Sequence, residues 1–237
     1  MMKSSTAYII LLFGFLCSCS SSVIYYKEKS SLPLNNSIQS TNSIDSIIKP
    51  YKDSMELEMN EVLATSDYDF IAARPSSNLM NWVSGALYAN VLRKVKLDAP
   101  SFCLLNFGSL RSTINKGNVT RGDIFKLMPF DNQVVVVQLP TSIISEIEAY
   151  IIKSGGEPMA NAKMFNNKLR IAISATEKNK EYFYVITSDY LLNGGDHMTF
   201  FQKNIKVIDP NILLRDALIE EAINQKKLID ISNTGIK

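Results

Sequence analysis

Residues 133–139 read Gln-Val-Val-Val-Val-Gln-Leu, and this stretch decides the fold class. β-branched residues favour strands, and a strand that is apolar on both faces must be covered on both sides by other elements. The stretch therefore predicts a central strand of a buried β-sheet. Pro140 and Thr141 follow it and are expected to open a helix that runs to about Lys153 and ends at Gly155 and Gly156.

Outward from this strand, the spacing of apolar residues predicts several more helices and strands. The other expected helices span 47–63, with Pro50 near its start, 77–94, 121–127 and 210–225. The other expected strands span 68–72, 101–106, 169–174 and 181–187. Because strands and helices do not alternate regularly, we predict an α+β fold, a mixed β-sheet packed with helices, rather than a doubly wound fold.

The first residues predict a targeting segment. Lys3 gives a short positive region, and the apolar run 7–16 is too short to span a bilayer comfortably. The run ends in Leu16-Cys17-Ser18-Cys19, which resembles a bacterial lipobox, in which a lipidated cysteine becomes the mature N-terminus. Residues 1–18 are then a lipoprotein signal peptide, Cys19 is the lipid anchor, and the protein is tethered in the bacterial cell envelope with its domain outside the cytoplasm. The alternative is an ordinary secretory signal peptide cleaved between Ser18 and Ser22.

Residues 19–44 are interpreted as a flexible tether because they are rich in Ser and Asn, and residues 45–237 as the folded domain. Hydrophobic residues make up 46% of the chain and charged residues 20%, which suits a packed core. A net charge of +2 makes nucleic acid an unfavourable partner. Once the leader is removed and Cys19 is lipidated, Cys103 is left either as a small buried hydrophobe or as a reactive thiol.

Three polar segments lie at predicted strand ends. Residues 106–111 read Asn-Phe-Gly-Ser-Leu-Arg, where glycine allows close backbone approach and arginine suits a phosphate or carboxylate. Residues 128–132 read Met-Pro-Phe-Asp-Asn, and residues 188–197 read Ser-Asp-Tyr-Leu-Leu-Asn-Gly-Gly-Asp-His. A carboxylate after two glycines is placed to accept hydrogen bonds from a vicinal diol. Taken singly, each segment also fits a plain turn, a surface arginine or a core phenylalanine.

Together, the order Asn-x-Gly-x-x-Arg, Pro-Phe and aromatic-x-x-Asn-Gly-Gly-Asp resembles the C-terminal domain of the 5′-nucleotidase family. That family also contains UDP-sugar hydrolases and 2′,3′-cyclic phosphodiesterases. The resemblance extends over roughly Tyr51 to Ala222 and includes the Ser77-Asn78-Leu79 segment that opens a long predicted helix. The Asn-Gly-Gly-Asp segment with its upstream aromatic residue is its most specific part.

The resemblance implies a substrate-binding role for several positions. Phe130 and Tyr190 would sandwich a base, and Asp196, in a loop that also supplies Asn193 and Gly195, would hold the ribose hydroxyls. Asn106 and Gly108 would contact the base or sugar, and Arg111 would face the phosphate. Arg74 lies near the position of an additional phosphate arginine.

The sequence also departs from the family pattern. The usual Leu-Gly-Asn-Leu is Ser76-Ser77-Asn78-Leu79 here, and Trp82 takes the place of the following aspartate. Tyr190 stands where phenylalanine is common, and its phenol ring can still stack. Ser109 replaces a glycine and Phe107 is bulky for its position, so both are expected to narrow the pocket.

The family hydrolyses its substrates with two metal ions held by Asp, His and Asn in an N-terminal calcineurin-like domain. This chain contains one histidine, His197, so we expect neither a metal site nor a catalytic Ser-His-Asp arrangement in it. Three hypotheses follow. The chain is a nucleotide- or nucleoside-binding component whose divalent metal ions sit in a separate calcineurin-like metallophosphatase. Alternatively, it is a non-catalytic nucleotide-binding envelope lipoprotein, or a degenerate domain whose loops persist only as turns.

Overall fold

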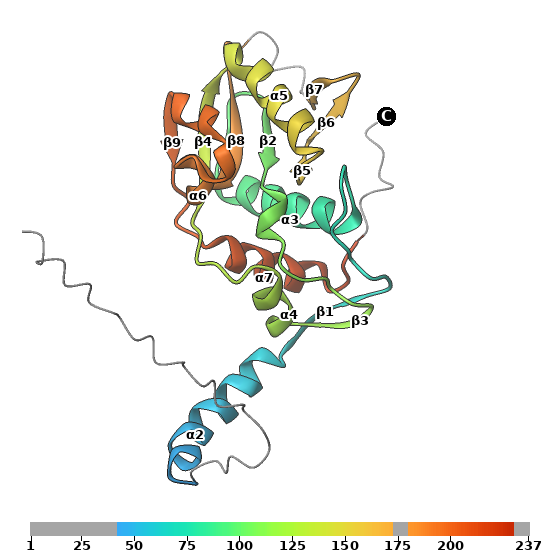
Figure 1. Cartoon of the computed structure of the whole chain (residues 1–237), viewed down its shortest axis with the longest axis vertical. Helices are drawn as coiled ribbons and strands as arrows, with labels where there is room; N and C mark the ends of the chain where they lie inside the picture. The colour runs from blue at the N-terminus through green and yellow to red at the C-terminus, as the bar shows by residue number, and fades with distance from the viewer. Residues whose placement is uncertain (1–41, 173–179, 230–237) are drawn as a thin grey trace, which may run out of the picture. The chain divides into compact units, whose positions relative to one another are not determined.

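Strand β4 (Val134–Pro140) lies between two other strands of a five-stranded sheet, in a computed structural model that describes residues 42–172 and 180–229 (Figure 1). The sheet has the order β5-β2-β8-β4-β9. Its other strands are β2 (Ser101–Leu104), β5 (Met159–Ala160), β8 (Tyr182–Ser188) and β9 (Lys206–Ile208). β2 and β8 are parallel, whereas the other three pairings are antiparallel. The predicted mixed sheet is therefore confirmed.

Both faces of β4 are covered, as its valine run predicts. Val134 and Val136 belong to a core cluster that includes helices α3 (Asn78–Lys94) and α7 (Leu214–Gln225). Val135 and Val137 belong to a second cluster, which includes helix α5 (Ile144–Ser154) and the 3-10 segment η5 (Thr199–Lys203). Because successive side chains of a strand point to opposite faces, one apolar strand contributes to both halves of the core.

The remaining described elements are short or lie outside this sheet. The helices are α2 (Asn42–Met59), α4 (Arg121–Leu127) and α6 (Asp189–Leu192), and the 3-10 segments are η1 (Phe107–Ser109), η2 (Thr141–Ile143) and η4 (Gly195–His197). β1 (Val62–Ser66) pairs antiparallel with β3 (Gly117–Thr120), and β6 (Ala162–Phe165) with β7 (Lys168–Ile171). Within the described residues no helix has the length and apolar character needed to cross a membrane.

Local capping explains why several helices match their predicted ranges. The Ser77 side chain accepts a hydrogen bond from the backbone N–H of Met80 and starts α3. Thr120 and Asp123 form a reciprocal capping box at the start of α4. Gly155 ends α5 with a φ of 81°, a left-handed conformation that favours glycine.

Several predicted ranges are wrong in detail. Pro140 is the last residue of β4, and the helix expected to open there begins at Ile144, after the 3-10 segment η2. The strand predicted at 101–106 ends at Leu104. Helix α2 begins at Asn42 and ends at Met59, so Pro50 lies inside it and residues 42–44 are helical rather than part of the tether. The strand predicted at 68–72 is replaced by β1, and Phe70 forms only an isolated bridge with Ile114. Helix α7 begins at Leu214, four residues later than predicted. β1 was missed because its partner, β3, is distant in the sequence and local periodicity does not reveal it.

The chain divides into two compact units, Met1–Asp45 and Ser46–Lys237. The predicted signal peptide (1–18), the proposed anchor Cys19 and the tether up to residue 41 lie outside the described residues. Residues 173 and 174, the last two of the strand predicted at 169–174, lie outside them as well. All elements of the sheet and its two core clusters belong to the second unit.

Candidate functional site

The sheet brings three distant loops to one edge. Because β2 and β8 are parallel, the loops that follow them emerge side by side. Because β4 is antiparallel to β8, with Val134 opposite Ser188, the segment that precedes β4 reaches the same edge. The three loops are the polar segments 106–111, 128–132 and 188–197.

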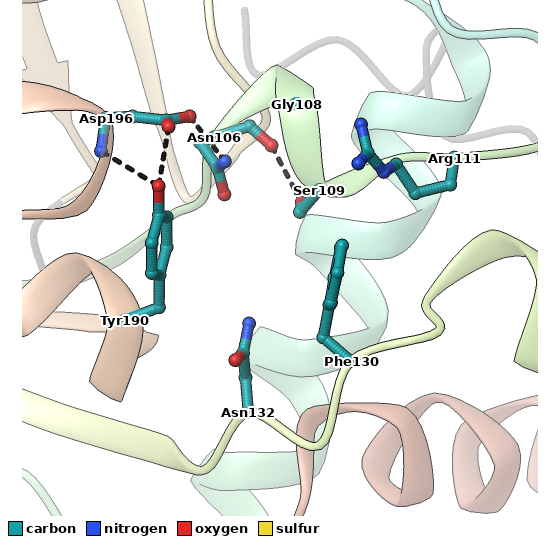
Figure 2. A pocket seen from close by; sticks show the side chains of 8 residues that line it. All are labelled: Asn106, Gly108, Ser109, Arg111, Phe130, Asn132, Tyr190 and Asp196. Carbon is teal, nitrogen blue, oxygen red and sulfur yellow. Dashed lines mark hydrogen bonds between the residues drawn. The ribbon is translucent and has the colours of Figure 1, made fainter. Parts of the chain in front are cut away.

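A cavity of about 320 Å³ lies among these loops, within the size range of ligand pockets. Figure 2 shows the rings of Tyr190 and Phe130 on opposite sides of the opening, with Asn132 between them and Asp196 and Asn106 at one end. The lining residues are Asn106, Gly108, Ser109, Arg111, Phe130, Asn132, Tyr190 and Asp196. The cavity thus combines two aromatic rings with a carboxylate, amides and one guanidinium.

The two aromatic side chains at the cavity are exposed. Phe130 is 40% exposed and Tyr190 is 45% exposed, although the sheet beneath them is fully packed. The guanidinium carbon of Arg111 lies 5.3 Å from the centroid of the Phe130 ring, in cation–π contact. Phe130 is therefore not a core residue, and its ring and the Arg111 charge flank the same cavity.

Asp189 fixes the position of Tyr190 relative to the segment before β4. Its carboxylate Oδ1 accepts hydrogen bonds from the backbone N–H groups of Gln133 and Tyr190, and its own N–H donates to the carbonyl of Gln133. Ser188 caps α6 by accepting from the N–H of Leu191. These bonds attach the start of α6, which carries Tyr190, to Gln133, which lies three residues after Phe130.

Asp196 is held by three side chains. Its Oδ2 accepts a hydrogen bond from Nδ2 of the buried Asn106 at 2.6 Å, and its Oδ1 accepts one from the hydroxyl of Tyr190 at 2.9 Å. The hydroxyl of Tyr150 donates to the backbone carbonyl of Asp196 at 2.9 Å. The backbone of Asp196 has a φ of 49°, a left-handed conformation that aspartate tolerates better than most residues. The acid is thus oriented by its neighbours before any ligand arrives.

The two tyrosines remain protonated donors at neutral pH. Burial raises the pKa of Tyr150 to about 12, and the nearby charges of Glu157 and Asp196 act in the same direction. The hydrogen bond to Asp196 raises the pKa of Tyr190. Both hydroxyls can therefore donate to Asp196 throughout the neutral range.

Two glycines leave room that a side chain would fill. A Cβ at Gly195 would lie 2.4 Å from Cε1 of Tyr190, so the ring packs directly against this part of the loop. A Cβ at Gly108 would lie 3.4 Å from Oδ2 of Asp196, on the lining of the cavity. Gly195 is thus needed for the position of the Tyr190 ring, whereas a Cβ at Gly108 would make only ordinary van der Waals contact with Asp196.

Arg74 lies beside the site, but its charge is paired. It lines a neighbouring cavity of about 560 Å³ that shares Tyr190 and Asp196 with the first one. Its Nε donates to the carbonyl of Gly156, and its Nη2 donates to Oε1 of Glu157 at 3.1 Å. Its guanidinium carbon lies 4.5 Å from the centroid of the Phe107 ring. The other oxygen of Glu157 accepts the backbone N–H of Phe107 at 2.5 Å, so this buried acid ties Arg74 to the loop of Asn106.

The structure brings together most of the residues that the sequence proposed as substrate-binding. Those that line the first cavity are Asn106, Gly108, Arg111, Phe130, Tyr190 and Asp196. Gly195 lines the neighbouring cavity instead. Asn193 lines neither of these two cavities, and its Nδ2 donates to the carbonyl of Asp189 within the loop.

Asn132 is a lining residue that sequence reasoning missed. It lies two residues after Phe130 in a segment already noted for its polar character, and that proximity was the available signal. Ser109 and Phe107 are the two residues of this loop that differ in size from the family pattern. Ser109 lines the cavity, whereas the Phe107 ring lies against the guanidinium of Arg74. Trp82 is buried, and its indole N–H donates to Gln225, so it serves the core.

Cys103 and His197 are two further side chains with groups that can react or bind a metal ion. Cys103 is fully buried, and burial raises the pKa of its thiol, as expected of a small core residue. His197 has a φ of 63° and lines the neighbouring cavity with Asp196. In residues 42–172 and 180–229, no three His, Cys, Asp or Glu side chains are grouped so that they could hold a metal ion.

Comparison with known proteins identifies related sequences and folds. The family described as 5′-nucleotidase, C-terminal domain, matches residues 61–180, which include the Asn106 loop and Phe130. An apyrase from Tabanus yao is 22% identical over 129 residues, which cover 44% of this chain and 23% of that protein.

Two solved structures share the fold at low sequence identity. The 5′-nucleotidase precursor from Thermus thermophilus is 16% identical, with a TM-score of 0.60 over 83% of this chain and 42% of that one. The NAD nucleotidase of Haemophilus influenzae is 14% identical, with a TM-score of 0.59 over 81% of this chain and 40% of that one. The chain therefore spans less than half the length of each of these relatives.

We predict that Glu157→Ala destabilises the domain by about 1–3 kcal/mol, because it leaves the Phe107 N–H and the Arg74 guanidinium without their shared partner. Urea unfolding followed by circular dichroism measures this change. Glu146→Ala is the matched control, since its pair with Lys203 is about half exposed on both sides and should contribute no more than about 0.5 kcal/mol. Equal losses in the two variants would contradict the role assigned to Glu157.

Proposed function

Because this chain belongs to the family of 5′-nucleotidase C-terminal domains, we propose that it forms the nucleotide- and nucleoside-binding half of a 5′-nucleotidase-type phosphohydrolase. One observation carries this proposal. Two exposed aromatic rings stand on opposite sides of a cavity that has a carboxylate at one end (Figure 2). A flat base with an attached sugar diol fits this combination of groups.

The base would lie between Phe130 and Tyr190. Stacking of a base on an aromatic side chain contributes about 1–3 kcal/mol and tolerates different bases, because each base has a π-face. Asn132 lies between the two rings and offers amide hydrogen bonds to the edge of the base. The rings thus supply affinity, while the amide orients the base.

The sugar and phosphate would lie along the polar part of the lining. The carboxylate of Asp196 accepts hydrogen bonds, and the hydroxyls of a ribose are suitable donors. Among the described residues that line this cavity, Arg111 alone carries a permanent positive charge, and its planar guanidinium suits a phosphate. In this arrangement Arg74 contributes less charge to the ligand, because Glu157 already neutralises it.

Hydrolysis needs two metal ions, and the donor set of the described residues does not fit them. A two-metal site requires several nitrogen and oxygen ligands around ions about 3.5–4 Å apart. The single histidine in the sequence and the lack of a suitable cluster among the described residues do not supply these ligands. We therefore propose that a separate calcineurin-like metallophosphatase provides the divalent ions, while this chain binds and orients the substrate.

We also propose that the protein is a lipid-anchored component of the bacterial cell envelope. The lipobox-like Leu16-Cys17-Ser18-Cys19 supports this proposal. Each CH₂ group of an acyl chain that is buried in a membrane contributes about 0.8 kcal/mol of favourable binding free energy. The binding domain would then work outside the cytoplasm, where it meets extracytoplasmic nucleotides.

Phe130→Ala is expected to weaken adenosine binding by about 5- to 150-fold, which corresponds to the loss of one stacking face. Asp196→Ala is expected to weaken adenosine more than free adenine, because it removes the acceptor for the ribose hydroxyls. Isothermal titration calorimetry with adenosine, AMP and UDP-glucose, each with and without divalent metal, measures these affinities.

Phe165→Ala is the matched control for Phe130→Ala. Phe165 is 57% exposed in the β6–β7 hairpin and lies outside the cavity, so its removal should leave affinity unchanged. Equal affinity in the wild type and in the Phe130→Ala, Asp196→Ala and Phe165→Ala variants would count against nucleoside binding in this cavity and favour a degenerate domain. Absence of binding by the wild type would do the same.

Mixing the purified chain with a calcineurin-like metallophosphatase from the same genome and a divalent metal is expected to release phosphate from AMP. The rate should exceed the sum of the two proteins assayed separately, and Asp196→Ala should reduce it. If the chain binds AMP but the mixture neither associates nor hydrolyses, the non-catalytic binding lipoprotein becomes the correct description.

Cys19→Ser is expected to abolish lipidation in a bacterial host. The wild type should gain the mass of acyl chains at Cys19 and partition into detergent, whereas the variant should do neither. Mass spectrometry of the mature N-terminus decides this point, because cleavage between Ser18 and Ser22 without added lipid would support an ordinary signal peptide.

A further inference from the structure

Stacking on a base needs only the ring of Tyr190, yet its hydroxyl makes two hydrogen bonds. The hydroxyl donates to Oδ1 of Asp196 at 2.9 Å and accepts the backbone N–H of the same residue at 3.3 Å (Figure 2). Both contacts are made to one residue, whose carboxylate lines the cavity. The phenol therefore connects the aromatic side of the cavity directly to its acidic end.

The carboxylate of Asp196 has one protein donor on each oxygen. Tyr190 donates to Oδ1 and the buried Asn106 donates to Oδ2. An ionised carboxylate has about four lone-pair sites, so each oxygen keeps capacity for one further donor. Two neighbouring hydroxyls of a ribose match this remaining capacity, whereas a deoxyribose supplies only one of them.

The loop leaves the carboxylate little freedom to adjust. The Tyr190 ring packs against Gly195, where an added Cβ would lie 2.4 Å from Cε1. Tyr150 also holds the carbonyl of Asp196, and the backbone there is in the left-handed region. Asn106 and Tyr190 each hold one carboxylate oxygen and together set the rotation of the carboxylate plane, so without the Tyr190 hydroxyl that rotation is restrained by Asn106 alone.

We propose that the hydroxyl of Tyr190 is a positioning group that orients the Asp196 carboxylate and thereby makes the cavity selective for ligands with an intact ribose diol. This inference rests on the proposed nucleoside-binding function and adds the class of sugar that the site prefers. Tyr190 then has two separable roles: the ring contributes to affinity for any base, and the hydroxyl contributes to discrimination between ribose and deoxyribose.

Tyr190→Phe separates these roles, because it keeps the ring and removes the hydroxyl. Calorimetry with adenosine, 2′-deoxyadenosine, 3′-deoxyadenosine and adenine measures the effect. We expect the wild type to prefer adenosine over both deoxynucleosides. In the variant, adenosine should weaken by about tenfold, as for loss of a hydrogen bond to a charged group. The other three ligands should change by less than about twofold, because none of them engages both oxygens of the carboxylate.

Tyr182→Phe is the matched control. Tyr182 donates a phenol hydrogen bond to Asp98 at 2.9 Å, and it lies at the opposite end of β8 from Tyr190. The variant loses a similar phenol–carboxylate hydrogen bond at a place outside the cavity. The ratio of adenosine to deoxyadenosine affinity should therefore be unchanged.

Three kinds of outcome would overturn the inference, and they differ in what they say about nucleoside binding. An unchanged ratio in Tyr190→Phe, or tighter adenosine binding in that variant, would mean that the hydroxyl does not orient the acid or competes with the sugar. A wild type that binds adenosine and both deoxynucleosides equally would mean that the diol is not recognised. In these two cases nucleoside binding itself stands, whereas a wild type that binds none of the four ligands would overturn both proposals.

Discussion

The pairing of β8 with its two neighbours is the constraint on which the site depends. β8 pairs in parallel with β2 and antiparallel with β4. The loops that follow β2 and β8 therefore start at the same edge of the sheet at which the segment before β4 ends. The interior valines, isoleucines and phenylalanines of these strands are almost fully buried, so the pairing is fixed by the core on both faces. A slip of one residue would exchange the two faces of a strand, and it would also displace a ring or the acid from the cavity.

Within this frame, hydrogen bonds to backbone groups do the finer positioning. Asp189 attaches α6 to the start of β4, and Glu157 attaches the Asn106 loop to Arg74. Both carboxylates accept a backbone N–H, which would otherwise be left unpaired near the cavity. The acids of this region therefore have different tasks: two hold loops in place, whereas Asp196 presents its oxygens to the cavity.

The sequence predicted the elements whose signals are local. The strand of the valine run and the helices predicted at 77–94 and 121–127 are confirmed. The valine run, the Ser77 cap of α3 and the capping box of α4 each act within a few residues. β1 and β3 were missed because their pairing joins segments more than 50 residues apart in the chain. In the site, the motifs indicated Phe130, Tyr190 and Asp196, but Asn132 and the Glu157–Arg74 pair became visible only with the fold. Their importance depends on which loops are neighbours in space.

The architecture also separates binding from chemistry. The groups proposed to bind base, sugar and phosphate come from three loops on one sheet edge, and the contacts that orient them lie within the same domain. The described contacts that organise this cavity lie within the domain, so under the proposed function ligand binding would not depend on the partner that supplies the metal ions. If a partner supplies the ions, its task is to approach the phosphate end of an already oriented ligand. In the proposed arrangement Arg111 would lie at that end, because it is a cationic lining residue in contact with the Phe130 ring.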